Sequence, residues 1–145
     1  KRVPKNILFD IKDNNDYLIW HGNHDGYRKN FNKIVARKLF ISKKGIDISG
    51  EDSIISTKMN EKDVLYDIRF HLTPICKVSL TRGKNSVLIK TQLNNSYIFE
   101  ADSNLAVGES VYINNGKSIE KTNQIVISGF VKSFKKTIKW KIRKL

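Results

Sequence analysis

The chain has 145 residues and a formal net charge of +13, from 27 lysines and arginines against 14 aspartates and glutamates. This length is enough for one domain with a buried hydrophobic core that needs neither disulfides nor a structural metal. The single cysteine excludes an intrachain disulfide, and with three histidines it gives no zinc-ligand spacing. No apolar run of about 18 residues is present to span a membrane.

Alternating apolar and polar residues recur along the whole chain, as in half-buried strands. Turn-forming groups such as Lys43-Lys44-Gly45 and Asn114-Asn115-Gly116 separate the segments, which are too close together for crossover helices. We expect an all-β fold, an antiparallel β-sandwich of about ten or eleven strands without long helices, with residues 1–145 as a single domain. The predicted strands are Asn6–Lys12, Asp16–Gly22, Lys33–Ser42, Ile46–Asp52, Val64–Leu72, Ile75–Thr81, Ser86–Leu93, Ser96–Glu100, Glu109–Ile113, Lys121–Ser128 and Lys135–Lys144.

The densest polar and aromatic cluster lies at the end of the second predicted strand and just after it, and contains His21, His24, Asp25 and Tyr27, with glycines at 22 and 26. Glycine permits sharp bends, so this loop could present His24 and Tyr27 together. Histidine and tyrosine are the acid and base types that a β-eliminating lyase uses. The alternative is a structural corner, in which Asp25 and Gly26 form a turn, Tyr27 packs with a bonded hydroxyl and the backbone satisfies His24.

Two regions are predicted to be irregular, Gly26–Asn32 and the polar segment Ile54–Asp63, which we expect to be a mobile loop. Glu51 and Asp52 are adjacent, so on a strand they point to opposite faces and cannot act as a catalytic pair. Glu51 is expected to close a turn after Gly50. The sequence contains no phosphate-binding glycine loop, no GxSxG and no HExxH.

The alternation is strictest in Val64–Leu72, where one face is aromatic and aliphatic and the other carries Asp67, Arg69 and His71. Arg69 and His71 share that face and could together hold a carboxylate or a sulfate. Asp67 could instead pair with Arg69 and neutralise it. Further along the chain, Cys76 falls on the apolar side of its strand and is interpreted as a small core residue.

The last predicted strand directs Ile138, Trp140 and Ile142 inward and three cations outward, which we call the basic ridge: Lys139, Lys141 and Arg143. This ridge could bind an anion, or it could be a solvated face that protects a sheet edge from pairing with other chains.

The positive charge favours a polyanionic partner, namely nucleic acid, an anionic lipid surface or an acidic polysaccharide. An AT-rich genome, which encodes lysine at solvated positions, is the competing explanation. Nucleic acid is poorly supported, because five aromatics that could stack on bases fall on the apolar phase of their strands and are predicted core residues: Tyr66, Phe70, Tyr97, Phe99 and Trp140.

The chain resembles the C-terminal β-sandwich region of the heparinase II/III family of bacterial polysaccharide lyases. The likeness covers nearly the whole chain, with the matching pieces in consistent order. Each short piece alone would be weak evidence for the family. The matching pieces are His24-Asp25-Gly26-Tyr27, Phe31, Arg37-Lys38-Leu39-Phe40-Ile41-Ser42, Gly50-Glu51-Asp52, Arg69-Phe70-His71-Leu72 with Pro74, Val78-Ser79-Leu80, Glu109-Ser110-Val111-Tyr112 and Gln124-Ile125-Val126-Ile127.

This resemblance implies β-elimination of acidic, uronate-containing glycans by a longer polypeptide, of which this chain would be the C-terminal fragment, packed against an N-terminal α-helical toroid. In the family, the catalytic asparagine or histidine and the tyrosine come from the toroid. Another histidine and the metal ligands, where present, lie early in the sandwich region. This chain is expected to begin after those motifs. The resemblance therefore assigns it no catalytic residue, no metal ligand and no cofactor, and any metal would belong to the missing upstream part.

We therefore expect a domain that is inactive alone, that supports the catalytic domain, and that lends cations to a polyanion cleft. Its substrate-binding candidates are His24, Tyr27, Arg69 and His71. The alternative is a stand-alone binding module for acidic glycans, and a nucleic-acid binder is a poorer third hypothesis.

Overall fold

The computed structural model describes residues 3–59, 63–93, 95–116, 118–132 and 134–145. These residues form eleven strands and one short helix, and the strands belong to two antiparallel sheets of eight and three strands. The chain divides into two compact units: unit 1 is Lys1–Tyr66 with Phe130–Lys141, and unit 2 is Asp67–Gly129 with Ile142–Leu145. Within the described ranges, no helix is long and apolar enough to cross a membrane.

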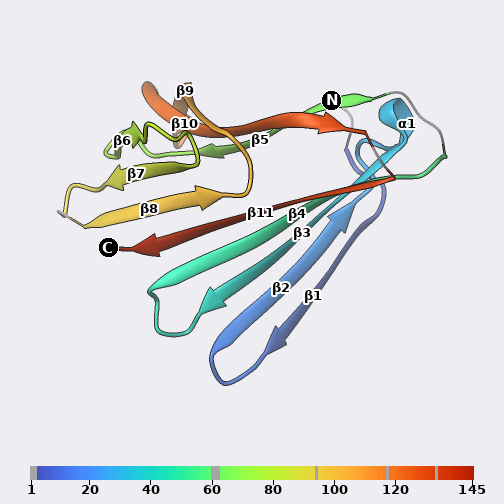
Figure 1. Cartoon of the computed structure of the whole chain (residues 1–145), viewed down its shortest axis with the longest axis horizontal. Helices are drawn as coiled ribbons and strands as arrows, with labels where there is room; N and C mark the ends of the chain where they lie inside the picture. The colour runs from blue at the N-terminus through green and yellow to red at the C-terminus, as the bar shows by residue number, and fades with distance from the viewer. Residues whose placement is uncertain (1–2, 60–62, 94, 117, 133) are drawn as a thin grey trace. The chain divides into compact units, whose positions relative to one another are not determined.

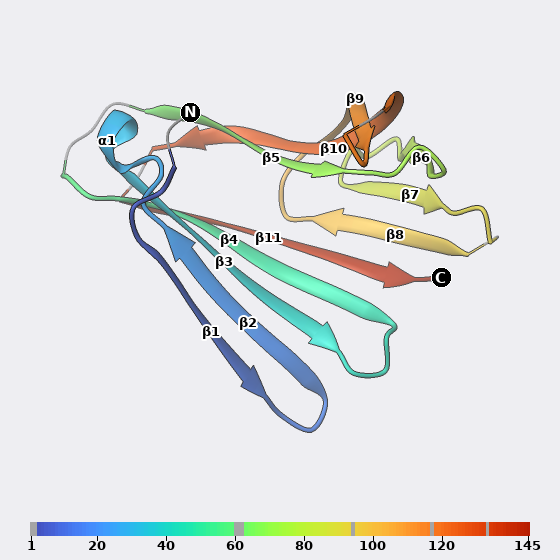
Figure 2. The ribbon, with the colours of Figure 1, turned by 180° about the vertical axis from the view of Figure 1, so that it is seen from behind.

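Unit 1 is built on two long hairpins whose strands lie side by side, joined by one further strand from the end of the chain (Figures 1 and 2). The order across it is β1-β2-β3-β4-β11. The bounds are β1 (Ile7–Asp13), β2 (Tyr17–His24), α1 (Arg28–Phe31), β3 (Lys33–Ser42), β4 (Asp47–Ser56) and β11 (Lys135–Lys144). The hairpin turn between β3 and β4 contains Gly45 at φ 69°, in the left-handed region that glycine enters without strain.

The strand register gives unit 1 one apolar face. Phe9 stands opposite Gly22, Gly22 opposite Arg37 and Arg37 opposite Asp52, so these four positions share that face. Its apolar members on the five strands are Ile7, Phe9, Ile11, Leu18, Trp20, Val35, Leu39, Ile41, Ile48, Ile54, Ile138 and Trp140. Burial is uneven: Ile138 is fully buried, whereas Phe9 on the edge strand β1 is 70% exposed.

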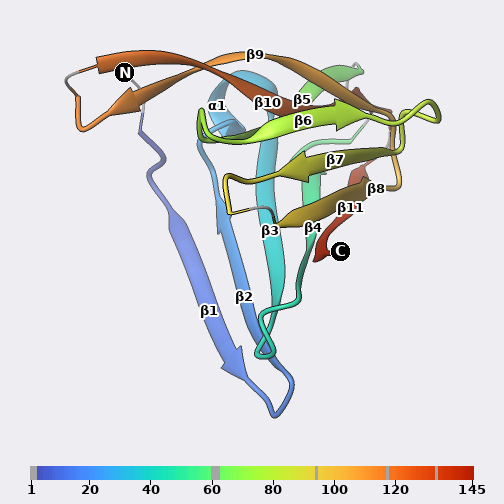
Figure 3. The same cartoon turned by 90° about the vertical axis from the view of Figure 1, so that its left-hand side faces the viewer.

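Unit 2 has two layers, which Figure 3 shows from the side. One layer has the order β6-β7-β8 and the other β5-β10-β9. Between them the Phe70 and Phe99 rings meet edge to face at 4.8 Å, and Val87, Ile125 and Ile127 are fully buried. The bounds are β5 (Val64–His71), β6 (Lys77–Leu80), β7 (Ser86–Lys90), β8 (Ser96–Ala101), β9 (Leu105–Asn114) and β10 (Ser118–Val131).

Three local predictions are corrected by the structure. Ile54–Ser56, expected to begin a mobile loop, instead completes β4, with Ile54 only 8% exposed. Residues 60–62 of that predicted loop lie outside the described residues. Glu51 lies inside β4 and closes no turn, and the region expected to be irregular at Gly26–Asn32 contains α1.

Candidate functional site

His24 and Tyr27 come together at the end of β2, where α1 begins. Their ring centroids are 5.7 Å apart, and Tyr27 in turn lies 6.3 Å from Phe31 on α1. The His24 Nδ1 accepts a hydrogen bond from the Gly26 N–H at 3.2 Å, which is the backbone contact that the structural-corner hypothesis requires. Tyr27 differs from that hypothesis, because it is 50% exposed and its hydroxyl has no hydrogen-bond partner among the described residues.

The neighbouring Asp25 fixes the corner to the start of the chain. Its carboxylate accepts hydrogen bonds from the Lys5 N–H at 2.9 Å, the Asn6 N–H at 3.1 Å and the Asn6 side-chain amide at 2.8 Å. The Asn6 backbone contact is the main reason why the pKa of the Asp25 carboxyl lies below its usual value. Asp25 therefore holds the segment before β1 against the corner that carries His24 and Tyr27.

The hydrogen bonding of His24 limits its chemistry. Because Nδ1 accepts the Gly26 N–H, a neutral imidazole carries its proton on Nε2. This tautomer donates a hydrogen bond and does not abstract a proton. Together with the exposed phenol of Tyr27, it is suited to holding an acidic or hydroxylated ligand, and both residues come from the same short segment of unit 1.

Arg69 and His71 lie on the outward face of β5, as the alternation predicts. Arg69 donates to the Asp67 carboxylate, which also accepts the Ser128 hydroxyl at 2.6 Å. The hydrogen bond from Ser128 is the main reason why the pKa of Asp67 lies below its usual value, and Arg69 is a further reason. The pairing of Asp67 with Arg69, one of the two sequence interpretations, is thus the one that the structure has.

His71 is held separately. Its Nδ1 lies 2.8 Å from the hydroxyl of Ser110 on β9. The two side chains meet across β10, which lies between β5 and β9 in the sheet. The structure therefore brings His24 and Tyr27 together in unit 1, whereas Arg69 and His71 share one face of β5 in unit 2 but bond different partners.

The basic ridge on β11 is matched by acidic side chains. Lys141 Nζ lies 2.7 Å from Asp47, Lys139 Nζ 3.6 Å from Glu51, and Arg143 Nε 3.3 Å from Glu100. Each ridge cation thus has a carboxylate beside it on a neighbouring strand. This arrangement agrees with a solvated face and reduces the charge that the ridge offers to a polyanion. The predicted protection of a sheet edge is wrong, because β11 lies between β4 and β8.

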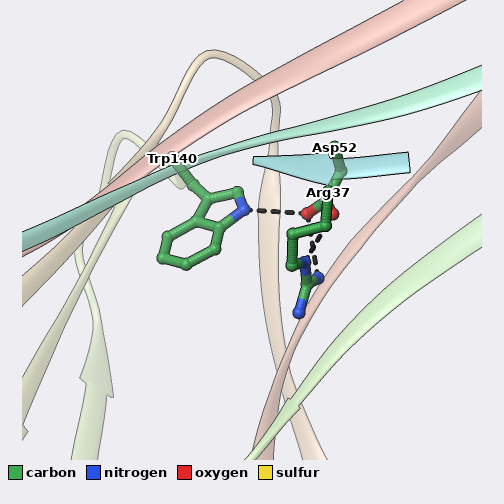
Figure 4. A network of polar contacts seen from close by, with 3 residues as sticks. All are labelled: Arg37, Asp52 and Trp140. Atoms are coloured by element: carbon green, nitrogen blue, oxygen red, sulfur yellow. Dashed lines mark hydrogen bonds and ion pairs between the residues drawn. The ribbon is translucent and has the colours of Figure 1, made fainter. Parts of the chain in front are cut away.

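Sequence reasoning missed a polar network on the apolar face of unit 1 (Figure 4). Arg37 donates to both oxygens of Asp52, at 2.6 and 2.9 Å, and the Trp140 indole N–H donates to the same carboxylate at 2.8 Å. The Arg37 guanidinium also lies 5.6 Å from the Trp140 ring centroid. The motif Gly50-Glu51-Asp52 was the available signal, but the partners of Asp52 lie on β3 and β11 and only the fold identifies them.

The described residues contain no group of three or more histidine, cysteine or carboxylate side chains that could hold a metal. Cys76 is half-buried, with its Sγ 3.5 Å from the Thr73 hydroxyl.

Eleven short antiparallel strands in two sheets, with facing layers in unit 2, confirm the predicted all-β sandwich. The family model "Heparinase II/III-like, C-terminal" matches residues 1–141. The chain belongs to this family, and the resemblance seen in its sequence motifs is confirmed.

Solved structures of similar fold agree with this assignment. The heparan sulfate lyase HepC from Pedobacter heparinus superposes with a TM-score of 0.75 over 95% of this chain, at 13% sequence identity. A heparinase III, the BT4657 gene product, gives a TM-score of 0.74 over 96% of the chain at 7% identity. At such identities the likeness concerns the fold alone. In both cases this chain corresponds to 21% of the larger protein.

One curated relative is similar in sequence. FtsZ-localized protein C of Caulobacter vibrioides (strain NA1000 / CB15N) is 28% identical over 130 residues, which is 83% of this chain and 22% of that protein. The chain therefore spans about a fifth of the length of the relatives that it matches.

Proposed function

We propose that this chain is the C-terminal β-sandwich domain of a heparinase II/III-like polysaccharide lyase, which cleaves acidic, uronate-containing glycans by β-elimination. Its role is to support the catalytic domain and to line one side of the polyanion cleft. The chain alone is inactive, because the catalytic residues of this family belong to an N-terminal α-helical toroid. Family membership over residues 1–141 supports this assignment.

The observation that carries the proposal is the exposed edge of the apolar face of unit 1. On β1, Ile7, Phe9 and Ile11 point to one side and are 63%, 70% and 53% exposed. They continue the face that also carries Trp20 and Leu39 on the next two strands. Apolar surface of this kind marks an interaction site, and the lyases of similar fold are about five times as long as this chain. The occupant that we propose is the toroid of the same polypeptide.

The first test is enzymatic. The larger protein, incubated with heparin-like, chondroitin-like and alginate-like polymers, should generate the ultraviolet absorbance of unsaturated uronates, and the 145-residue chain should generate none. A larger protein that is silent on every acidic polymer, or a chain that is active alone, contradicts the proposal.

The docking role has its own test. Ile7→Ser should leave the stability of the isolated chain nearly unchanged, since Ile7 is already in water there, but should lower the melting temperature and activity of the larger protein. Ile119→Ser is the matched control, because Ile119 is 74% exposed on β10 of unit 2. Equal effects of the two changes in the larger protein would argue against the apolar face as the docking surface.

The second candidate function is a stand-alone module that binds acidic glycans without catalysis. The net charge of +13 and the contact of half-buried His24 with exposed Tyr27 favour it. Titration of the chain with acidic polymers at two salt concentrations tests whether it binds without any upstream domain. The lyase assay distinguishes the two functions, because a binding module generates no unsaturated uronates.

A further inference from the structure

The outer face of β6, β7 and β8 in unit 2 carries a pair of lysines. Lys77 on β6 stands directly opposite Lys90 on β7, and Lys90 stands opposite Ser96 on β8. Directly opposed side chains on antiparallel strands have Cβ atoms about 5 Å apart, so the two ammonium groups can converge on one point. Both lysines are exposed.

This pairing runs against the charge pattern of the rest of the chain. Like charges directly opposite each other destabilise a sheet. In the registers of β1–β2, β2–β3, β3–β4, β9–β10 and β7–β8, no described position has two like charges opposite each other. Arg37 and Lys38 instead face Asp52 and Glu51. Neither Lys77 nor Lys90 has an acidic partner within the described ranges, whereas every cation of the basic ridge has one.

Protection of a sheet edge does not explain both lysines. β6 is the last strand of its sheet, so Lys77 alone could discourage pairing with another chain. Lys90 lies on β7, which has hydrogen-bonded neighbours on both sides, β6 and β8 (Figure 3). Two unmatched cations that face each other on adjacent strands are instead the arrangement that an anionic group would stabilise.

The residues around the two lysines are of the types that bind a saccharide. One step along the strands, the same face carries Ser79 opposite Leu88 and Leu88 opposite Ile98. Leu88 and Ile98 are half-buried, so each leaves part of an apolar side chain on this face, and Ser79 and Ser96 stand beside them in the register. An apolar floor with hydroxyl and cationic groups around it suits the C–H face, the hydroxyls and the acidic substituents of a sugar.

We propose that the outer face of β6–β7–β8 is a binding subsite for a sulfated or carboxylated polysaccharide, in which Lys77 and Lys90 together hold one sulfate or carboxylate group. A sugar ring rests on Leu88 and Ile98, and Ser79 and Ser96 bond its hydroxyls. This subsite deepens the proposed function, from which it takes the class of polymer. It uses residues other than the four candidates taken from the sequence.

The test is calorimetric titration of the 145-residue chain with a heparin hexasaccharide. Lys77→Gln/Lys90→Gln should weaken binding roughly tenfold, since two exposed charge contacts each contribute a factor of a few. The control Lys84→Gln/Lys121→Gln removes the same charge from exposed positions of unit 2, one in the turn at the other end of the β6–β7 hairpin and one on β10, and should change affinity less than about twofold. Ile98→Ser should also weaken binding.

Stability supplies an independent reading. Without ligand, the Lys77→Gln/Lys90→Gln chain should melt at the same temperature as the parent chain or higher, because a like-charge repulsion is removed. Equal losses of affinity in the lysine variant and its control, unchanged affinity in the lysine variant, absence of binding by the parent chain, or equal affinity for polyglutamate each overturn the subsite. None of these results bears on the lyase assay of the larger protein, so the two proposals fail separately.

Discussion

Asp52 is a carboxylate within the apolar face of unit 1, and both of its oxygens are occupied. Asp52 is 3% exposed. One carboxylate oxygen accepts a hydrogen bond from Arg37, and the other accepts hydrogen bonds from both Arg37 and Trp140. Burial of a charge is costly unless it is paired and fully bonded, and here three donors come from two other strands. The network therefore fixes how β3, β4 and β11 line up within unit 1.

Removal of this carboxylate should destabilise the chain strongly. Asp52→Ala leaves the Arg37 guanidinium and the indole N–H of Trp140 without their acceptor, and the free energy of unfolding should fall by about 2–4 kcal/mol. Urea unfolding followed by tryptophan fluorescence measures the change. The adjacent Glu51→Gln is the control, because its ion pair with Lys139 is largely exposed and its loss should cost below about 0.5 kcal/mol. Similar losses in both variants would refute the role of Asp52.

Asp67 gives unit 2 a pH dependence. Its folded pKa is lowered, so ionisation of this group stabilises the folded state at pH values above the ordinary pKa of 3.8. That stabilisation disappears as the pH falls through the lowered folded value. Ser128→Ala removes the largest cause, so the Asp67 pKa should rise toward 3.8, while the pKa of Asp25, lowered by Asn6, stays where it is. Carboxyl NMR titration reads both groups, and an unmoved Asp67 contradicts the assignment.

The variant should also be less stable than the parent chain at neutral pH, and the difference should shrink as the pH falls below the ordinary pKa of 3.8 and through the lowered folded value. Chemical unfolding at pH 7 and at pH 3 checks this sign.

Among the strands, a prediction from sequence succeeds where one face is clearly apolar. In β5 the residues alternate between half-buried and exposed along the whole strand, and in β11 Ile138 and Trp140 are buried while Lys139 is exposed, both as the period of two indicates. Prediction from sequence fails where the end of a strand is set by hydrogen bonds to residues far away in the chain. Ser56 joins β4 because its N–H bonds the Phe134 carbonyl, and its hydroxyl accepts from the buried Lys33.

A close approach of tryptophan rings to glycines is the other feature of these strands that hydrophobic periodicity does not reveal. A Cβ at Gly50 of β4 would lie 2.3 Å from the Trp140 ring, and one at Gly22 of β2 would lie 2.4 Å from the ring of Trp20. Both glycines thus leave room for an indole that lies flat on the sheet.

The two glycines should nevertheless differ in tolerance. Trp140 is 7% exposed and hydrogen-bonded to Asp52, so its ring cannot move away from a new methyl group. Gly50→Ala should therefore lower the free energy of unfolding by about 2–3 kcal/mol. Trp20 is half-buried and can move toward water, so Gly22→Ala should cost less. Thermal unfolding of the two variants ranks them, and a larger loss for Gly22→Ala would contradict the rigidity assigned to Trp140.

For the molecule as a whole, the candidate site was less predictable than the fold. From the sequence came the candidates His24, Tyr27, Arg69 and His71. The contact of His24 with Tyr27 and the pairing of Arg69 with Asp67 could be anticipated because these groups are close in the chain. It could not tell which cations are matched by acids on distant strands, as Arg143 is by Glu100, 43 residues away. A net charge of +13 favours a polyanionic partner, whereas the strand register is needed to find the opposed lysines Lys77 and Lys90 on which the proposed subsite is based.

The attraction should depend strongly on salt. Screening shortens the range of exposed charges from about 10 Å at 0.1 M to about 3 Å at 1 M ionic strength. The affinity for a heparin hexasaccharide should therefore fall steeply between these conditions, and the slope should be smaller in the Lys77→Gln/Lys90→Gln chain. A salt-independent affinity would exclude an electrostatic role for the net charge.

β11 belongs to both units, with Lys135–Lys141 in unit 1 and Ile142–Leu145 in unit 2. During synthesis on the ribosome it emerges after every other strand described, yet it brings the indole that Asp52 requires from 88 residues away. Neither unit can then complete its native packing until translation has passed these final positions. A nascent polypeptide that is truncated before β11 should remain vulnerable to proteases along its whole length, however many of its hairpins have already formed.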